Sequence, residues 1–406
     1  MRGVSVKNGP TYPTRVAVVK VLHTADNHLD PKLSYLGARL MDRRRDFMES
    51  FLRVVGYALE HKPHLFLVAG DLFDSVNPRN PARTQVIRAF RRLHSEGIRV
   101  FLIGGNHDMP RSVEEGMSPL HEVEASGYAR FFSSVEQPGV EHLTVDGVDV
   151  AVVGLSFNHE VPADENPLRY LGVRLPREGD IAIAMLHYNL AGVSVAPPWK
   201  APTVFREDIP SEYRYVALGH VHAHAVVDLA GGVAAYPGST ERRSFAEEGD
   251  PSKGFLWVEV PLEGKPRLRL VELPTRSMRT VRVDVGPQVE DPVEHVLRHL
   301  PPADQNLMLR LVVRGQLPLS KLAKYSRAAL LKRLEGVFFH VSIDDSELRC
   351  EVQVVGAPVH ESTSPIEAFK AEVEERMRSA KSEEERAVLE LALRLGLQRL
   401  EEAGAW

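Results

Sequence analysis

The sequence predicts an α/β sandwich, followed by a smaller α+β module and a pair of C-terminal helices. Two patterns support the sandwich. In the first half of the chain, short apolar segments typical of buried parallel strands alternate with segments of helical periodicity. Residues 226–273 are β-rich and supply an antiparallel half. A chain of 406 residues is also too long for one ordinary hydrophobic core, so several domains are expected.

The elements of the first unit alternate between strands and helices. Apolar runs bounded by turn residues indicate the strands, and apolar stripes at helical spacing indicate the helices. Pro81 opens one helix and Gly97 closes it, while Asp146 and Gly147 predict a hairpin between two strands. In chain order, the sequence predicts strands at 16–22, 65–69, 98–103, 140–145, 148–154, 181–186 and 215–218, and helices at 37–61, 81–95 and 114–126.

A second unit is expected to start at Pro274, and polar, proline-containing residues after Gly356 predict a linker. Beyond it, Ser364 and Ser382 occupy N-cap positions of two predicted helices. The second unit is predicted to contain strands at 279–285, 307–314, 337–344 and 348–355 and helices at 291–300 and 320–334. The predicted domains are an N-terminal extension (1–15), a first domain (16–273), a second domain (274–356), and a linker with C-terminal helices (357–406).

The composition indicates a soluble globular protein, with 43% hydrophobic and 26% charged residues. Cys350 is the single cysteine, which excludes an internal disulfide and favours a reducing, cytoplasmic compartment. No segment approaches the ~20 apolar residues that cross a bilayer, and the N-terminus lacks the apolar stretch of a signal peptide, so we expect no membrane association. The net charge of −5 argues against coating nucleic acid by bulk charge, but it permits a local basic surface.

Five predicted strands end in residues that commonly bind metal ions. Imidazole and carboxylate groups are ligands for manganese, iron, zinc and similar divalent ions. A single such residue at a strand end is usually structural, and Asn106 alone could cap a turn, but five such strand ends are improbable by chance. Seven candidates are too many for one ion and fit two, with Asp71 as the carboxylate between the dications. The candidates are Asp26, His28, Asp71, Asn106, His187, His220 and His222.

His107 is the candidate catalytic residue. It directly follows Asn106, so it is placed to contact a phosphate and to help the leaving oxygen depart. Two metal ions stabilise the attacking and leaving oxygens of a phosphoryl displacement and generate hydroxide from bound water. The sequence therefore predicts two-metal chemistry on a phosphate ester.

The ordered motifs resemble those of the calcineurin-like metallophosphoesterases. Within that superfamily, the chain is similar to the SbcD nuclease subunits of double-strand-break repair. The features that narrow the resemblance are residues 70–74, residues 237–242 and the small second domain. The resemblance covers nearly the whole chain and implies a four-layer αββα sandwich with a smaller α+β capping domain. The motifs are Asp26-x-His28, Gly70-Asp71-x-x-Asp74, Gly105-Asn106-His107-Asp108, His187 and Gly219-His220-x-His222.

The resemblance also implies the ligand sets. It implies two Mn²⁺ per chain, with Mg²⁺ or another divalent ion as an alternative. His107 would be the catalytic histidine, and Asp108 would orient it. Asp74 departs from the histidine usual in archaeal and eukaryotic members, and an acid there cannot act as a cation toward phosphate. One ion would be held by Asp26, His28, Asp71 and His222, and the other by Asp71, Asn106, His187 and His220.

The function that the resemblance implies is a manganese-dependent DNA nuclease in double-strand-break repair. It would act as an exonuclease on duplexes, in the 3′–5′ direction, and as an endonuclease on single strands. The expected partners are DNA, a second copy of the chain through helices 82–96 and 114–126, and an SbcC-like SMC-type coiled-coil ATPase through residues 364–403. Excess apolar surface on the last helix agrees with the ATPase partner, although this helix could instead fold back on its own domain.

Two other classes of function compete with the nuclease. One is a different phosphoesterase of the same fold, acting on phosphoprotein or nucleotide substrates. The other is a non-catalytic scaffold of a repair complex, which is disfavoured because all seven expected ligands and His107 are present. The capping module and residues 237–242 favour DNA, whereas the acidic net charge argues mildly against it.

Overall fold

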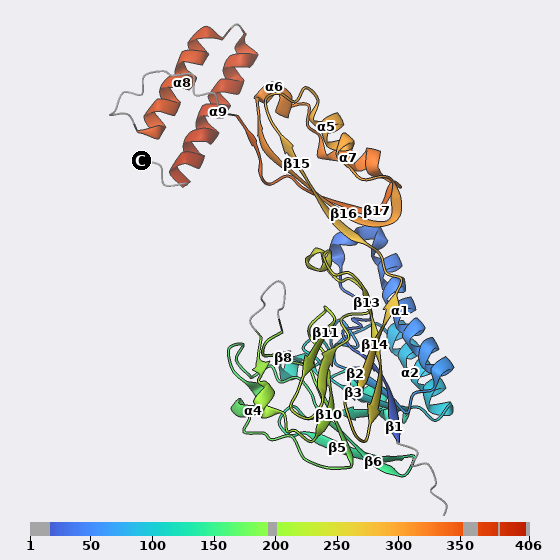
Figure 1. The fold of residues 1–406 in the computed structure, drawn as a ribbon. Coiled ribbons are helices and arrows are strands. Elements are labelled where there is room, and N and C mark those ends of the chain that lie inside the picture. Colours follow the sequence, from blue (N-terminus) through green and yellow to red (C-terminus); the bar gives the residue numbers. More distant parts are fainter. Residues whose placement is uncertain (1–16, 194–200, 352–363, 381, 403–406) are drawn as a thin grey trace, which may run out of the picture.

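Two six-stranded sheets packed face to face form the larger part of the chain in the computed structural model (Figure 1). The structure describes residues 17–193, 201–351, 364–380 and 382–402. The predicted extension at 1–15 and the linker segment at 357–363 lie outside these residues. The predicted α/β sandwich is confirmed.

The first sheet has a parallel centre and an antiparallel edge. β1 to β4 run parallel, whereas β13 pairs antiparallel with β1, and β14 pairs antiparallel with β13. Because the central strands are parallel, their carboxyl ends meet at one edge. In spatial order the strands are β14 (Arg267–Leu273), β13 (Lys253–Pro261), β1 (Val18–Thr24), β2 (Leu65–Ala69), β3 (Arg99–Ile103) and β4 (Arg130–Phe132).

The second sheet repeats this plan with antiparallel strands at both edges. Its four central strands are parallel, and β5 and β11 pair antiparallel with their neighbours. Asp146 and Gly147 have φ of 48° and 84°, as the predicted tight hairpin between β5 and β6 requires. In spatial order the strands are β11 (Ala225–Asp228), β12 (Val233–Tyr236), β10 (Tyr213–Leu218), β7 (Ile181–Leu186), β6 (Val148–Leu155) and β5 (Gly139–Val145).

The inner faces of the two sheets share one apolar core. Leu67 of β2, Ile103 of β3 and Ile183 of β7 belong to it and are fully buried. Burial of each such side chain contributes about 1.5–3 kcal/mol to folding. This core fixes the two sheets to each other, so the strand ends of both sheets are held in a constant relation.

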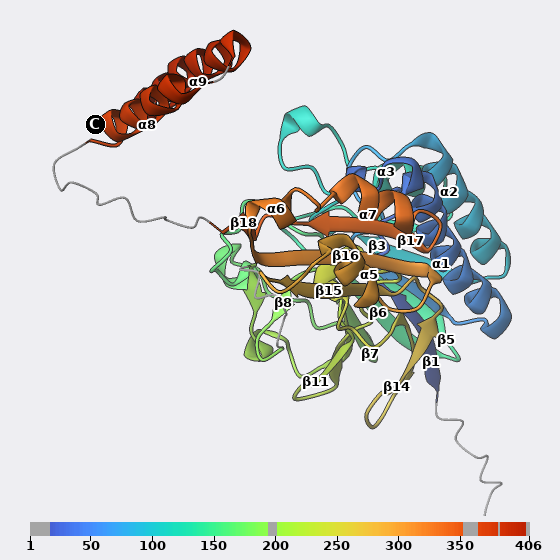
Figure 2. The ribbon, with the colours of Figure 1, turned by 90° about the horizontal axis from the view of Figure 1, so that it is seen from above.

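Helices cover the outer face of the first sheet. α1 (Leu40–His61) follows the 3-10 helix η1 (Ser34–Arg39), and α2 (Asn80–Ser95) packs beside α1 (Figures 1 and 2). Phe47, Phe51 and Phe90 are fully buried in the cluster beneath these helices. Lys62, with φ of 49°, ends α1, and its N–H donates to the Ala58 carbonyl oxygen at 2.8 Å.

Two helices predicted as continuous are interrupted. The predicted helix 114–126 is instead a 3-10 turn, η2 (Val113–Glu115), followed by the short α3 (Leu120–Ala125). Gly116, with φ of 85°, ends the first turn, and the chain re-enters helix only after Pro119. Predicted helix 320–334 is likewise divided into α6 (Leu319–Leu322) and α7 (Arg327–Leu334), because Ser326 caps a new helix through the Ala329 N–H at 3.2 Å.

The outer face of the second sheet is covered mainly by extended segments. Phe157, Leu168 and Tyr188 pack there against the strands. The regular elements of this layer are short, so the fourth layer of the implied αββα sandwich contains little helix. They are α4 (Pro167–Tyr170), β8 (Asn189–Leu190), β9 (Thr203–Val204) and the 3-10 helix η3 (Arg206–Asp208).

The second unit is a four-stranded sheet in which every pair runs parallel. Its helices pack on one face, where Val283, Leu311 and Leu330 form the core. Its elements are β15 (Met278–Val285), α5 (Pro292–Arg298), β16 (Asp304–Leu317), α6, α7, β17 (Phe338–Asp344) and β18 (Leu348–Cys350).

Arginines join the second unit to the sandwich. The Arg276 guanidinium pairs with Asp46 of α1 at 2.6 Å and lies 3.7 Å from the centre of the Phe339 ring. Arg242 donates to the Thr275 hydroxyl at 2.7 Å. These contacts tie the connection at 274–277 to both units.

The last two helices, α8 (Pro365–Ser379) and α9 (Glu383–Glu402), pack against each other as a hairpin (Figure 2). The predicted caps are present, since the Ser364 hydroxyl accepts the Glu367 N–H and the Ser382 hydroxyl accepts the Glu385 N–H. Gly396 lies directly against the Phe369 ring, which allows the two helices to approach closely. Among the described residues, none of the helices has the length and apolar character needed to span a bilayer.

Candidate metal centre

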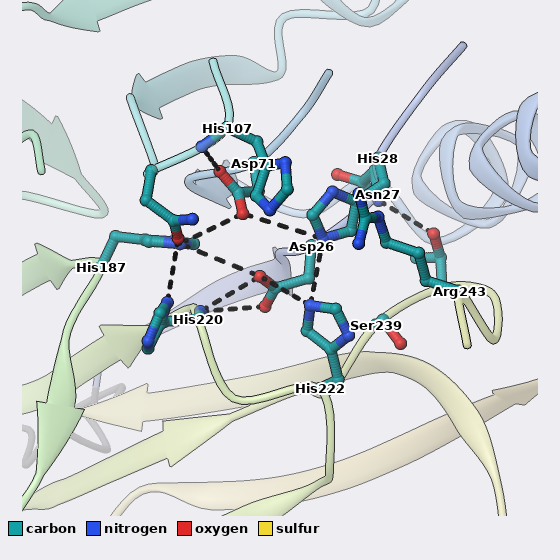
Figure 3. A network of polar contacts seen from close by, with 12 residues as sticks. Asp26, Asn27, His28, Asp71, His107, His187, His220, His222, Ser239 and Arg243 are labelled. Atoms are coloured by element: carbon teal, nitrogen blue, oxygen red, sulfur yellow. Dashed lines mark hydrogen bonds and ion pairs between the residues drawn. The ribbon is translucent and has the colours of Figure 1, made fainter. Parts of the chain in front are cut away.

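The predicted site residues converge where five strands from both sheets end (Figure 3). β1, β2 and β3 of the first sheet face β7 and β10 of the second across this point, which is the usual location of ligands in α/β proteins. All the predicted ligands therefore come together. They are Asp26 and His28 after β1, Asp71 after β2, Asn106 after β3, His187 after β7, and His220 and His222 after β10.

The backbone turns sharply at these strand ends. Asp26, His28, Asp71 and His220 have φ of 50°, 43°, 51° and 94°, a region that residues other than glycine rarely adopt. Such strained residues concentrate at functional sites, where the surrounding structure holds them in place. Here the Asp26 N–H donates to the Gly70 carbonyl oxygen at 3.1 Å, and the His28 N–H donates to that of Asp71 at 3.0 Å. The turns after β1 and β2 therefore support each other.

Glycines beside the ligands allow this close approach. A Cβ atom on Gly105 would lie 2.3 Å from Asp71 Oδ1, and one on Gly219 would lie 2.0 Å from the Ala69 carbonyl oxygen. Neither contact is sterically tolerable, and the second is with rigid backbone. Gly105 and Gly219, which precede Asn106 and His220, are therefore packing requirements of the centre.

We define the first ligand group as Asp26, His28, Asp71 and His222. The Nε2 atoms of His28 and His222 lie 3.0 Å apart. His222 Nε2 is 3.8 Å from Asp26 Oδ1, and His28 Nε2 is 3.7 Å from Asp71 Oδ2. Nitrogen and carboxylate oxygen atoms thus surround one point, at the distances expected of groups that share a cation.

We define the second ligand group as Asp71, Asn106, His187 and His220. His187 Nε2 lies 3.4 Å from Asp71 Oδ2 and 3.3 Å from Asn106 Oδ1, which is 3.0 Å from His220 Nδ1. Asp71 therefore contacts both groups, as predicted for a shared carboxylate. Asp26 also contacts residues of both groups, since its Oδ1 lies 4.0 Å from His187 Nε2.

Burial and charge act against each other in this cluster. Burial tends to raise the pKa of Asp71, but His187 and His107 outweigh it and hold that pKa well below its usual value. Burial tends to lower the pKa of His187, but Asp71 outweighs it and raises this pKa to about 9. Burial, with His187 beside it, lowers the pKa of His220 to about 3. Burial also raises the pKa of Asp26. Carboxylate and amide oxygens that face imidazole nitrogens suit a divalent cation.

The outward-facing nitrogen of each of three histidines has an acceptor nearby. His222 Nδ1 donates to Glu247 Oε1 at 3.1 Å, and His187 Nδ1 donates to the Ala69 carbonyl oxygen at 2.8 Å. His28 Nδ1 lies 3.3 Å from Asp74 Oδ1. The His28–Asp74 contact has an ion-pair distance without hydrogen-bond geometry, whereas the acceptors of His187 and His222 place the proton on Nδ1 and leave the Nε2 lone pair directed into the centre. This is the usual arrangement of metal-binding histidines.

His107 lies at the edge of the first ligand group, with its ring centre 4.8 Å from that of His28. The backbone N–H of His107 donates to Asp71 Oδ1 at 2.8 Å, and the ring Nδ1 lies 3.2 Å from the Asp74 carbonyl oxygen. Burial lowers its pKa to about 4, although Asp71 acts in the opposite direction. One ring nitrogen lies within 4.8 Å of ligand atoms of His28 and Asp71, so the ring directly borders the first ligand group.

Asp108 does not have the contact predicted for it. Its Oδ2 accepts the N–H groups of Leu72 and Phe73 at 2.8 and 3.3 Å, and its Oδ1 accepts the Gly105 N–H at 2.7 Å. Among the described residues, the acceptor beside the His107 ring is the Asp74 carbonyl oxygen instead. Asp108 thus holds the turn after β2 against the loop after β3, and it positions His107 only indirectly.

Sequence reasoning missed the residues behind the ligands. Asp74 was noted for its departure from the family pattern, but not for its position beside His28. Glu247 and Lys253 follow no strand end of the metal-binding type, so no signal of that kind marked them. In the structure Lys253 Nζ is 2.6 Å from Glu247 Oε2 and 3.0 Å from the His222 carbonyl oxygen.

Residues 19–224, which contain every predicted ligand, match the calcineurin-like phosphoesterase family. The chain is 33% identical over 281 residues to the DNA double-strand break repair protein Mre11 of Aeropyrum pernix, with 66% of this chain and 64% of that protein covered. It is 30% identical over 242 residues to the Mre11 protein of Methanocaldococcus jannaschii, with 59% and 62% covered. It is also 30% identical over 244 residues to the uncharacterized metallophosphoesterase YhaO of Bacillus subtilis, with 59% and 57% covered. The chain thus spans about three fifths of the length of these relatives.

Proposed function

The chain belongs to the calcineurin-like phosphoesterase family, and we propose that it is a metal-dependent phosphodiesterase that hydrolyses DNA. The observation that carries this proposal is the convergence of carboxylates, imidazoles and the Asn106 amide from five strand ends into two ligand groups that share Asp71. Two divalent ions held there would supply charge stabilisation for the phosphate and a bound water of lowered pKa.

The residues of the chain have distinct roles in this reaction. Asp71 would help to hold both cations, and its negative charge would reduce their mutual repulsion. His107 stands beside the first ligand group, where it can contact the phosphate. A phosphate anion next to the ring favours the protonated imidazole, which can then donate its proton to the leaving oxygen.

The choice of DNA as substrate rests on two supports. Two of the relatives are described as DNA double-strand break repair proteins. In addition, the second unit contacts the loop that follows β12. Arg310 of β16 lies 5.1 Å from the centre of the ring of Phe245, the first residue of the 3-10 helix η4 (Phe245–Glu247). Tyr35, from the segment between His28 and α1, contacts the His340 ring of β17. The small sheet thus contacts two segments that adjoin the ligand loops, as a domain that closes over DNA would.

Finer features follow the same proposal. We propose Mn²⁺ as the ion, 3′–5′ exonuclease action on duplexes, endonuclease action on single strands, and a cytoplasmic location. The seven ligands contain no thiolate, which is compatible with manganese. The single cysteine supports a reducing compartment.

Cleavage of an end-labelled DNA duplex by the purified chain tests the proposal. Mn²⁺, Mg²⁺ and chelator would be compared, with bis-p-nitrophenyl phosphate as a generic phosphodiester. Manganese-dependent shortening of DNA, abolished by chelator, is the expected result. Inert DNA beside rapid turnover of the small ester would overturn the nuclease in favour of another phosphoesterase. The label position reports the direction of degradation.

We propose a homodimer through the predicted helices 82–96 and 114–126, with its apolar contact at residues 113–117, where the second of these segments begins. Within the described residues 80–126, the exposed large apolar side chains are Val113 and Met117, exposed by 95% and 69%. Exposed residues of α2 include Arg88, Arg91 and Arg92, which do not form an apolar contact. Light scattering of the parent chain and of a Val113→Ser, Met117→Ser double variant measures the oligomeric state. The variant should be monomeric, and an unchanged dimer would exclude this contact.

We propose that the α8–α9 hairpin binds the coiled coil of an SbcC-like SMC-type ATPase. The side of α9 that faces α8 contains Leu393 and Gly396, whereas Val388, Leu391 and Leu395 are exposed on the opposite side. Their i, i+3, i+7 spacing makes an apolar stripe suited to another helix.

Truncation at about residue 360 should abolish binding of a purified SbcC-like ATPase and leave metal-dependent cleavage intact. Leu391→Glu with Leu395→Glu should do the same within the full chain, whereas Arg386→Glu, at an exposed position outside the i, i+3, i+7 stripe, should not. Binding that survives both the truncation and the double substitution would place the ATPase contact elsewhere.

A further inference from the structure

We propose that Arg243 is a positioning residue for the first ligand group, acting on His28 through Asp74 and on His222 through Glu247. The inference rests on the metal-binding part of the proposed function and is independent of the substrate. It concerns residues after β12, in a segment where no ligand was predicted. Its basis is that one residue contacts both carboxylates behind the histidines of this group.

The Arg243 side chain makes the first connection. Its Nε donates to Asp74 Oδ1 at 2.6 Å, and the same oxygen lies 3.3 Å from His28 Nδ1. Asp74 is nearly fully buried, and its other oxygen accepts the Lys32 N–H at 2.8 Å. The carboxylate is therefore fixed in orientation, and Arg243 supplies the positive charge that compensates it. A buried carboxylate without such a partner would be costly.

The Arg243 backbone makes the second connection. Its N–H donates to Glu247 Oε1 at 3.0 Å, the oxygen that also accepts from His222 Nδ1 at 3.1 Å. The other Glu247 oxygen is held by Lys253 at 2.6 Å and by the Ser239 hydroxyl at 3.1 Å. Glu247 is thus fully occupied by partners that fix its direction toward His222.

The neighbouring residue anchors this segment. Arg242 donates to the Asp250 carbonyl oxygen and the Thr275 hydroxyl, both at 2.7 Å. Its own carbonyl oxygen accepts from the buried Arg43 of α1 at 2.6 Å. Arg243 is therefore presented to the two carboxylates from a rigid support, which is what a positioning role requires.

Loss of partners behind metal ligands typically weakens metal binding by about 10–100-fold. We expect Arg243→Gln to weaken one of two Mn²⁺ sites within that range, because Asp74 loses its charged partner while the second ligand group is untouched. Glu247→Gln should weaken the same site, through His222. Arg243→Lys should recover part of the affinity, because it restores the charge beside Asp74 but not the geometry of Nε.

The measurement is equilibrium dialysis of the full chain against Mn²⁺ alone, with electron paramagnetic resonance of the bound metal. Two ions that share Asp71 give a spin-coupled spectrum, so weakening of one site converts it to that of isolated Mn²⁺. Arg243→Gln combined with Asp74→Asn should be little weaker than either change alone, since both break one connection. Additive losses of Mn²⁺ affinity would mean that Arg243 does not act through Asp74.

Arg79→Gln is the matched control. Arg79 Nε donates to Asp30 Oδ1 at 2.8 Å, and Asp30 is a buried carboxylate two residues beyond His28. Among the described residues, Asp30 has no contact with a ligand histidine, so this variant should bind Mn²⁺ as the parent chain does. Parent-like Mn²⁺ binding by Arg243→Gln, or an equal loss in Arg79→Gln, would overturn the inference. A chain that binds two Mn²⁺ but leaves DNA intact would overturn the nuclease and leave this inference standing.

Discussion

The two ligand groups differ in what lies behind their histidines. His28 and His222 of the first group are backed by the side chains of Asp74 and Glu247, which are charged. In the second group, His187 is backed by the Ala69 carbonyl oxygen, and the His220 ring lies nearly parallel to that of Phe157. The first group thus depends on loop residues, whereas the second depends on the sheet and its core.

This difference has a chemical consequence. A carboxylate behind an imidazole makes that imidazole a more basic ligand than a neutral carbonyl group does. The first group should therefore bind its ion more tightly and respond to single substitutions in residues 242–253. The second should be weaker, and it should respond mainly to changes that disturb the backbone. Asp71 is the element that the two groups share.

Replacing Asp71 should remove the difference by disabling both groups. Asp71→Asn removes the shared charge, which is worth several kcal/mol in a two-metal site. We expect DNA cleavage to fall by roughly a thousandfold or more and both Mn²⁺ to be lost, as measured by dialysis and metal analysis. Asp228→Asn, at an exposed aspartate paired with Lys265, is the control. About two bound ions in Asp71→Asn would refute the shared role.

His107→Gln should separate chemistry from metal binding. The residue belongs to neither ligand group, so both ions should remain, while loss of proton transfer lowers cleavage by about 10²–10⁴-fold. Single-turnover cleavage with parallel metal analysis measures both quantities. His121→Gln, in α3, should change neither of them. An unchanged cleavage rate in His107→Gln would remove this residue from the mechanism.

The contrast between the groups also explains what could be read from the sequence. The ligands follow apolar strands, and the carboxyl ends of parallel strands must meet, so a pattern such as Gly70-Asp71 becomes informative when several strands end in this way. Glu247, Lys253 and Arg243 reach the centre through a loop whose path depends on contacts distant in sequence, so no local pattern marks them. The break at Gly116 was missed for a related reason. Apolar residues at helical spacing continue through it and outweighed the helix-breaking Gly116 and Pro119, whereas the observed φ of 85° at Gly116 shows that the helix stops.

Gly219→Ala should disturb the second group selectively. A Cβ atom there would lie 2.0 Å from the Ala69 carbonyl oxygen and 2.7 Å from His187 Nδ1, so it would break the hydrogen bond behind His187. Overpacking of this kind costs about 1–3 kcal/mol of stability. We expect one Mn²⁺ to bind about 10–100-fold more weakly.

Urea unfolding and Mn²⁺ dialysis test these two effects of Gly219→Ala. Gly56→Ala is the control, because a Cβ atom there has open space around it and lies within α1, where alanine is preferred over glycine. If Gly219→Ala kept both sites at full affinity, the backbone contact would not be what holds the second group.

The smallest effect is expected for a change at His142. This exposed histidine shows what a contact with carboxylates does without burial. It also contacts carboxylates, with Nε2 2.9 Å from Glu178 and Nδ1 3.0 Å from Asp149, but all three side chains are exposed. These two acids, Glu178 first, raise the pKa of His142. A raised pKa in the folded state stabilises the fold below the unfolded value of about 6.5, and this contribution disappears as the pH rises through the folded pKa.

His142→Gln should therefore lower the melting temperature slightly at pH about 5.5 and not at pH about 8.5, with Mn²⁺ binding unchanged. A pH-independent loss of stability would mean that His142 contributes by packing. A clear loss of Mn²⁺ binding in His142→Gln would mean that an exposed histidine–carboxylate contact also affects the metal centre. It would contradict the view that such contacts tune metal binding only where water is excluded.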